Sequence, residues 1–193
     1  MLSPPDSPRG KLLSRYVCAR ITRMDDVNIG LFEQDWNNTI YYFVTNADEE
    51  IYLRYGGRDA KGPGTYLNLQ SLETALQQGL ELHRRYQQGE LKKSTRPKAL
   101  YPRNIPLLVE RTFARRSCVE CHLIGDFLNL QREREGTLEK LKHLYVYPDI
   151  TTLGIRLDVP KGLVVNEAGG AVASAGMRAG DRITALNGMP VCH

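Results

Sequence analysis

A continuous run of β-prone residues, followed by a polar turn and an alternating segment, constrains the fold of this chain most strongly. Residues 39–45 (Thr-Ile-Tyr-Tyr-Phe-Val-Thr) are all β-branched or aromatic, which predicts a central strand buried on both faces. Residues 46–50 have turn chemistry, and residues 51–55 alternate in polarity before Gly56 and Gly57. The short connection between the two strands predicts an antiparallel hairpin.

An amphipathic helix is predicted after a Gly-rich loop. Apolar residues recur there at spacings of three and four, at Leu69, Leu72, Leu76, Leu80 and His83. This spacing places them on one face of a helix. We predict that the helix ends near Gln88 and that Ser71 supplies a capping hydroxyl near its start.

The N-terminal part predicts little regular structure before residue 16. Residues 1–15 are rich in Pro and Ser and predict a disordered lead-in. They lack the apolar core of a signal peptide, so we expect a cytoplasmic protein or a true N-terminus that lies elsewhere. Residues 16–22 are apolar and partly β-branched, which predicts a strand. Cys18, in the middle of that strand, is expected to be a small buried hydrophobe.

Positive charge is concentrated in one segment of the 193-residue chain, whose net charge is +4. Residues 84–116 hold ten lysines or arginines against Glu90 and Glu110. Such a segment can contact nucleic acid, anionic lipid or an acidic partner, but the composition of residues 89–150 favours a solvated basic linker. No nucleic-acid-binding motif is present. No apolar run approaches the ~20 residues of a transmembrane helix.

The linker carries a Cys-x-x-Cys-His motif at Cys118, Cys121 and His122. In the first hypothesis the two thiols bind the vinyl groups of a c-type haem and the histidine ligates its iron. A distal ligand is then needed, and the sequence does not choose among the candidates Met24, Met177, Met189, His83 and His143.

Three other hypotheses explain the same motif. A redox dithiol is favoured by Arg115 and Arg116 just upstream, whereas Glu120 between the cysteines opposes thiolate formation. A metal site would need further ligands, of which His143 is one. In the last interpretation the motif is part of a solvated loop with two ordinary cysteines.

The C-terminal segment resembles the first half of a PDZ domain. Residues 151–158 (Thr-Thr-Leu-Gly-Ile-Arg-Leu-Asp) are similar to the carboxylate-binding loop and the strand after it. The resemblance implies that Leu153, Gly154 and Ile155 present backbone N–H groups to a peptide's terminal carboxylate. It also implies that the strand with Arg156 and Leu157 pairs with the peptide by β-augmentation.

The remainder of this segment agrees with the same family. Residues 162–165 predict a strand, and residues 168–177 resemble the family's short helix of small residues. Residues 178–191 resemble its Gly-Asp signature, and Asn187-Gly188 is a strong hairpin signal in its own right. The family's second groove wall comes later in its sequence, so we expect a truncated PDZ domain over residues 151–193.

Residues 16–88 resemble the C-terminal half of a thioredoxin-like fold, through the hairpin and the helix after it. Members of that family carry Cys-x-x-Cys on a preceding helix and a cis-proline before the hairpin. Here residues 1–15 are too short to hold that helix, and Trp36-Asn37-Asn38 stands in place of the proline. A thioredoxin-type oxidoreductase is therefore not supported, and we do not expect a complete enzyme.

The order of these parts is similar to a group of bacterial two-domain thioredoxin-like/PDZ proteins, some of them selenoproteins. The resemblance implies an α+β fold, an exported or periplasmic location, and peptides or protein C-termini as partners. We therefore expect a redox-associated protein with a PDZ peptide-binding module, with haem c as the expected cofactor of the Cys-x-x-Cys-His motif. The alternative is a non-catalytic PDZ scaffold with a structural thioredoxin-like domain.

Overall fold

The protein is an α+β chain whose described residues form two compact units. The computed structural model describes residues 3–38, 40–59, 61–62, 64–113, 119–146, 149–186 and 189–191. Its mixture of helices and strands confirms the predicted α+β class. Unit 1 comprises Met1–Cys18, Ile40–Ser94 and Asp149–His193, and unit 2 comprises Ala19–Thr39 and Thr95–Pro148.

The predicted hairpin forms in unit 1, with β1 (Tyr42–Thr45) antiparallel to β2 (Ile51–Tyr55). Its turn is held by Asn46, whose side-chain oxygen accepts the N–H groups of Asp48 and Glu50 at 2.9 Å each. The prediction that the first strand is buried on both faces was wrong. In the described part of the chain the sheet has two strands, and α2 covers one face, so Tyr42 and Phe43 stay half-buried.

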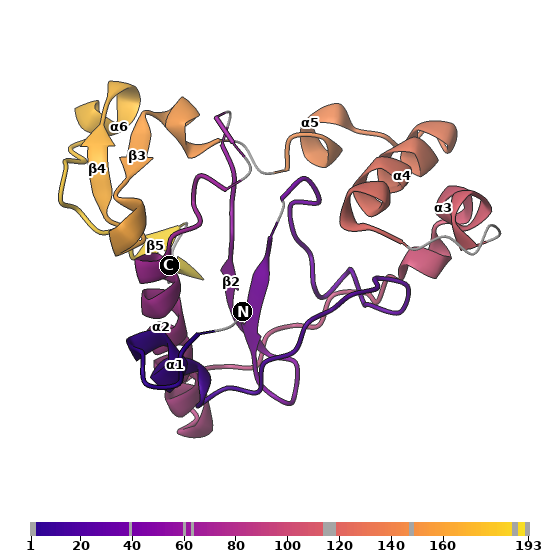
Figure 1. Ribbon diagram of the computed structural model, residues 1–193. Coiled ribbons are helices and arrows are strands. Elements are labelled where there is room, and N and C mark those ends of the chain that lie inside the picture. Colours follow the sequence, from indigo (N-terminus) through magenta and orange to yellow (C-terminus); the bar gives the residue numbers. More distant parts are fainter. Residues whose placement is uncertain are drawn as a thin grey trace. The chain divides into compact units, whose positions relative to one another are not determined.

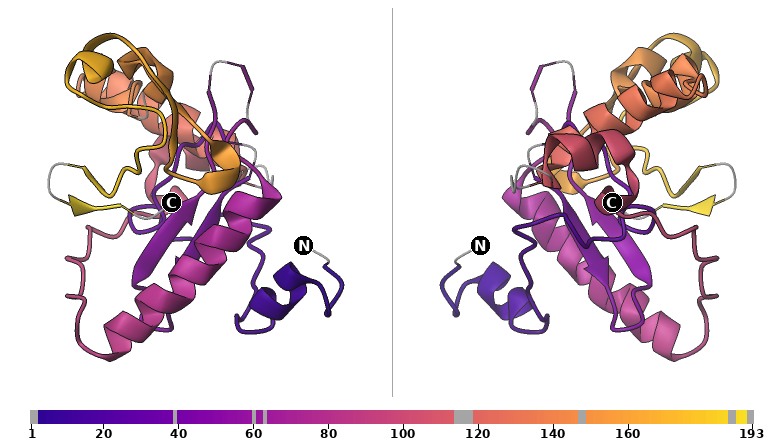
Figure 2. Two further views of the ribbon diagram at one scale, coloured as in Figure 1. Left: turned by 90° about the vertical axis from the view of Figure 1, so that its left-hand side faces the viewer. Right: turned by 90° about the vertical axis from the view of Figure 1, so that its right-hand side faces the viewer.

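Helix α2 (Leu69–Gln87) packs on the hairpin, as Figure 2 shows, and confirms the predicted amphipathic helix. The shared core consists of Val44, Leu53, Tyr55, Leu72, Ala75 and Leu76. Gly79 allows close contact, because a Cβ there would lie 2.7 Å from a methyl group of Val44. The cap is Asn68, whose side chain accepts the Gln70 N–H at 2.8 Å. Ser71, predicted as the capping residue, is instead fully buried.

The Tyr55 hydroxyl joins the hairpin to the start of α2. It donates to the Asn68 carbonyl at 2.8 Å, accepts the Asn68 N–H at 2.9 Å, and lies 2.8 Å from the Ser71 hydroxyl. Tyr55 is only 3% exposed, so water does not replace these bonds when the hydroxyl is removed.

Tyr55→Phe is expected to lower the free energy of unfolding by about 1–3 kcal/mol, because buried polar groups lose their partner. Urea unfolding followed by circular dichroism measures this difference. Tyr145→Phe is the matched control, since Tyr145 is 66% exposed and its hydroxyl can be hydrated. Equal effects of the two changes would contradict this role of Tyr55.

The N-terminal segment differs from prediction. The lead-in contains α1 (Pro8–Leu13), capped by the Ser7 hydroxyl, which accepts the Gly10 N–H at 3.0 Å. The strand predicted over residues 16–22 is not formed, and Cys18 is exposed rather than buried. Leu12, Leu13 and Tyr16 pack against the core of unit 1, and no strand among the described residues pairs with residues 16–22.

The C-terminal part of unit 1 alternates short strands and helical turns (Figure 1). Its elements are η3 (Ile150–Leu153), β3 (Ile155–Leu157), η4 (Val159–Lys161), β4 (Val165–Ala168), α6 (Gly170–Ser174), β5 (Ala185–Leu186) and β6 (Met189–Pro190). Strands β3 and β4 are antiparallel, as are β5 and β6. The register of β5 and β6 matches the predicted hairpin, whose turn residues Asn187 and Gly188 lie outside the described residues.

Unit 2 is held by its own apolar cluster. Its helices are η1 (Pro102–Asn104), α3 (Pro106–Arg111), α4 (Cys121–Arg134) and α5 (Lys140–His143). Ile29, Ile105, Leu108, Val119 and Ile124 form the buried centre. Helix α4 ends before Gly136, whose φ of 68° is a left-handed conformation that glycine adopts readily. Among the described helices, none combines the length and apolar character needed to cross a bilayer.

The boundaries of the two compact units agree only in part with those of the predicted domains. The junctions at Ser94/Thr95 and Pro148/Asp149 lie close to the linker boundaries proposed at residues 89 and 150. Residues 19–39, however, belong to unit 2 together with the linker, whereas the hairpin and α2 belong to unit 1 with the C-terminal segment.

Candidate functional site

The loop before β3 is built on a short helical turn that Asp149 fixes. The Asp149 carboxylate accepts both the N–H and the hydroxyl of Thr151, at 2.9 and 2.8 Å. The Gly154 N–H donates to the Thr151 carbonyl at 2.9 Å and ends the turn. Gly154 itself has φ 82° and ψ 17°, a left-handed conformation that glycine adopts without steric cost.

Gly154 is also the point of closest contact between this loop and the end of β4. A Cβ at this position would lie 2.4 Å from the Gly169 carbonyl oxygen. The Gly169 N–H donates to the Gly154 carbonyl at 2.8 Å. The loop therefore needs glycine here for two independent reasons, its positive φ and this approach of backbone to backbone.

The residues predicted to bind a peptide lie on this loop and on β3. Ile155 is 5% exposed and anchors the strand, whereas Leu153 is 60% exposed. Arg156 faces solvent and pairs with Glu167 of β4 at 3.2 Å. Leu157 is half-buried. The sequence prediction thus selected one continuous loop and strand, with an exposed apolar side chain beside a buried one.

Strand β3 has one strand neighbour, β4, in the described part of the chain. An edge strand presents backbone N–H and C=O groups along its open side, and such an edge can pair with another chain. The arrangement of η3, Gly154 and β3 can therefore accept an extended peptide by adding a strand.

The Cys-x-x-Cys-His motif lies in unit 2, where Cys121 begins α4. Cys118 lies outside the described residues. Cys121 is half-buried, and the side-chain amide of Gln34 donates to its sulfur at 3.8 Å. Burial raises the pKa of the Cys121 thiol above its ordinary value, and the negative charge of Glu120 adds to this rise. The Gln34 hydrogen bond acts in the opposite direction.

The surroundings of Cys121 are apolar on one side and open on the other. Val119 and Ile124 are buried, while His122 faces solvent. Trp36 packs on α4 at Gly125, where a Cβ would lie 2.8 Å from the Trp36 Cβ. Sequence reasoning missed Gln34 and Trp36 at this site. Both residues lie far from Cys121 in the sequence, so no local sequence pattern connects them with it.

The candidate distal and metal ligands are spread over the chain. Met24 packs against the apolar cluster that includes Val119 and Ile124. His143 accepts the Glu139 N–H on its Nδ1 at 3.0 Å, within α5. His83 belongs to unit 1, where its Nδ1 lies 3.0 Å from the Tyr52 hydroxyl. Over the described residues, no three His, Cys, Asp or Glu side chains gather in a way that could hold a metal ion.

The raised pKa of Cys121 predicts slow alkylation near neutral pH, because the thiolate is the reacting form. Iodoacetamide labelling of the folded chain, followed by peptide mass mapping, is expected to modify Cys121 more slowly than the exposed Cys18. The rate at Cys121 should keep rising with pH beyond the range of an ordinary thiol. Gln34→Ala removes a bond that lowers the pKa and should slow labelling at Cys121 further at a given pH.

Labelling of Cys18 serves as the internal control in both proteins. Faster reaction at Cys121 than at Cys18 near neutral pH would contradict the raised pKa. An unchanged rate at Cys121 in Gln34→Ala would contradict the contact between the amide and the sulfur.

No protein-family model, curated protein or solved structure matches this chain. Function is therefore argued from the residues and their geometry.

Proposed function

We propose that this protein binds extended peptides along β3, with the C-terminal part of unit 1 acting as a PDZ-like binding module. The observation that carries the proposal is the succession of η3, Gly154 in its left-handed conformation, and a strand with one strand neighbour in the described residues. A peptide that adds to this edge gains main-chain hydrogen bonds and places alternate side chains on the strand's two sides.

A peptide C-terminus fits this site better than an internal segment. The loop that contains Leu153 and Gly154 directly precedes β3. A peptide that pairs antiparallel with β3 runs toward this loop, so its C-terminus lies beside it. The Gly154 N–H, which the resemblance assigns to the peptide carboxylate, is donated to the Thr151 carbonyl at 2.9 Å. The exposed Leu153 side chain offers an apolar contact for the last residue of the peptide.

Leu153→Asp is expected to weaken peptide binding about tenfold or more. It replaces an apolar contact with a negative charge beside the peptide carboxylate, which is equivalent to a loss of about 1.4 kcal/mol or more. The measurement is fluorescence anisotropy of a labelled library of decapeptides with free C-termini. Amidation of the peptide C-terminus should weaken binding to the unchanged protein in the same way.

Leu186→Asp is the matched control, since Leu186 is 59% exposed and Leu153 is 60% exposed. Both variants add the same charge at an exposed leucine of unit 1, and the control should bind peptides as the unchanged protein does. Equal weakening by both variants, or binding that ignores amidation, would overturn the assignment of the site to β3.

The hairpin and α2 support the thioredoxin-like part of the proposal. An antiparallel hairpin followed by a helix packed on one face is the arrangement that the resemblance implies for residues 39–88. The missing strand at residues 16–22 departs from it. We assign this half a structural role in unit 1, and export of the protein to an oxidising compartment remains part of the proposal.

A second candidate function is electron transfer through a c-type haem held by Cys118, Cys121 and His122. The chemistry of this donor set fits a haem, since two thiols can form thioether bonds and the imidazole can ligate iron. Two observations favour this function over a redox dithiol. The raised pKa of Cys121 opposes the thiolate that thiol–disulfide exchange requires, and Met24 packs in the apolar cluster that flanks this cysteine.

Expression with an export signal and cytochrome-maturation machinery tests this candidate. Haem is expected to remain bound on a denaturing gel and to be lost in Cys118→Ala/Cys121→Ala. Trp36, the chain's one tryptophan, packs one turn from Cys121, so its fluorescence should be quenched by attached haem. A folded product without covalent haem would remove this function and leave the peptide-binding proposal unaffected.

A further inference from the structure

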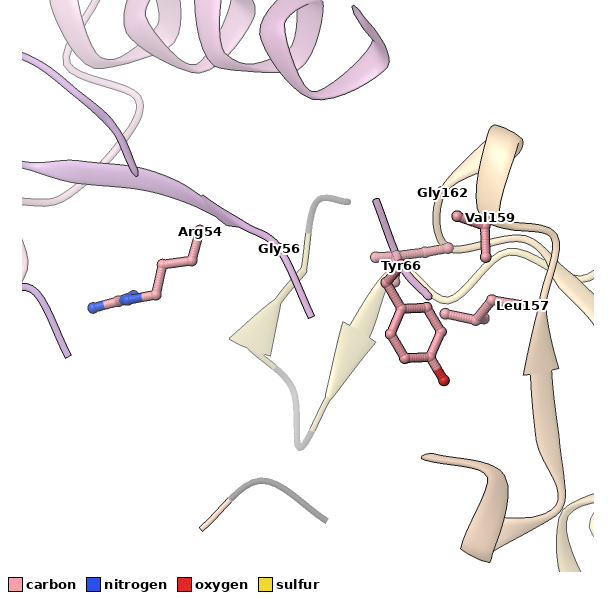
Figure 3. Close-up of a pocket in the computed structure, with 7 residues that line it drawn as sticks. Arg54, Gly56, Tyr66, Leu157, Val159 and Gly162 are labelled. Atoms are coloured by element: carbon pink, nitrogen blue, oxygen red, sulfur yellow. The ribbon is translucent and has the colours of Figure 1, made fainter. Parts of the chain in front are cut away.

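A small apolar cavity lies beside the last residue of β3 (Figure 3). Its volume is about 150 Å³, and it is lined by Arg54, Gly56, Tyr66, Leu157, Val159, Gly162 and Leu163. Two regions of unit 1 therefore form it together, the end of β2 with Tyr66 on one side, and β3 with the segment after it on the other. In Figure 3 the Tyr66 ring lies beside Leu157, and the Arg54 side chain points away from them.

The Tyr66 ring packs against Gly57, two residues after the end of β2. A Cβ on Gly57 would lie 3.2 Å from Cδ2 of the Tyr66 ring, so the ring lies directly against the backbone there. Partial burial raises the pKa of the Tyr66 hydroxyl above its ordinary value. The charges of Asp149 and Arg156 also act on this hydroxyl, which places it near the loop and strand assigned to peptide binding.

The size of the cavity limits what it can hold. Pockets for drug-sized ligands have volumes of roughly 300–1,000 Å³, about twice this volume or more. Leu157, Val159 and Leu163 supply aliphatic walls. A single apolar side chain fits such a space and gains free energy by leaving water.

We propose that Tyr66 is a specificity-determining residue of the peptide site, and that the cavity it borders accepts one apolar side chain of the bound peptide. The inference rests on the proposed function. It adds a contact from outside residues 151–193, because Tyr66 belongs to the segment that precedes α2. A peptide that runs antiparallel to β3 with its last residue opposite Ile155 places its third-from-last residue opposite Leu157.

The experiment measures anisotropy of labelled decapeptides that end in a free carboxylate and differ only in the third-from-last residue, as alanine, valine, leucine or phenylalanine. The unchanged protein is expected to bind the leucine peptide about tenfold more tightly than the alanine peptide, because the longer side chain buries more apolar surface in the cavity. Tyr66→Ala opens the cavity and should reduce this ratio to about one. Tyr66→Phe keeps the ring and should retain the ratio.

The outcomes separate the two proposals. If the peptides bind and the preference for leucine over alanine is the same in Tyr66→Ala as in the unchanged protein, the role of Tyr66 is wrong while peptide binding stands. If no peptide binds to the unchanged protein, both proposals fail. Circular dichroism and urea unfolding of Tyr66→Ala establish that a changed ratio does not arise from loss of the fold.

Discussion

The packing of α2 on one face of the β1–β2 hairpin is the interaction on which unit 1 depends. A two-stranded hairpin is at best marginally stable in water, so its apolar side needs a cover. The helix supplies it through Leu72, Ala75 and Leu76, and the buried Tyr55 hydroxyl fixes where the helix begins. The loop that leads from β2 into α2 carries Tyr66. The position of this ring beside β3 therefore depends on the hairpin-helix packing and on its contact with Gly57.

Local patterns predicted the elements of the fold better than their surroundings. The hairpin and the helix over residues 69–87 each have a signal within a few residues, in turn chemistry or in periodicity. Residues 16–22 have a strand-like composition, but a strand also requires a partner, and the sequence does not show whether one exists. Ser71 and Asn68 can both cap a helix, and the burial of Ser71 under Tyr55 decided between them.

The candidate sites also combine features that were expected from the sequence with contacts that were not. The turn at Gly154 and the strand after it were expected from the resemblance to a PDZ loop, and the left-handed conformation of Gly154 gives this turn a steric reason. Gln34 at Cys121, 87 positions away in sequence, and Tyr66 at Leu157 could not be predicted. These contacts depend on how the units fold, and no spacing rule connects such positions. Burial gives Cys121 a raised pKa, where the arginines upstream had suggested a lowered one.

Amide hydrogen exchange along β3 tests the central claim most directly. The N–H groups of residues 155–157 are followed with and without a saturating peptide that has a free C-terminus. Strand addition predicts that exchange slows at one or more of these amides, because new hydrogen bonds protect them, while amides of α4 in unit 2 are unchanged. Binding of the peptide without any added protection on β3 would show that it binds elsewhere and would contradict the account.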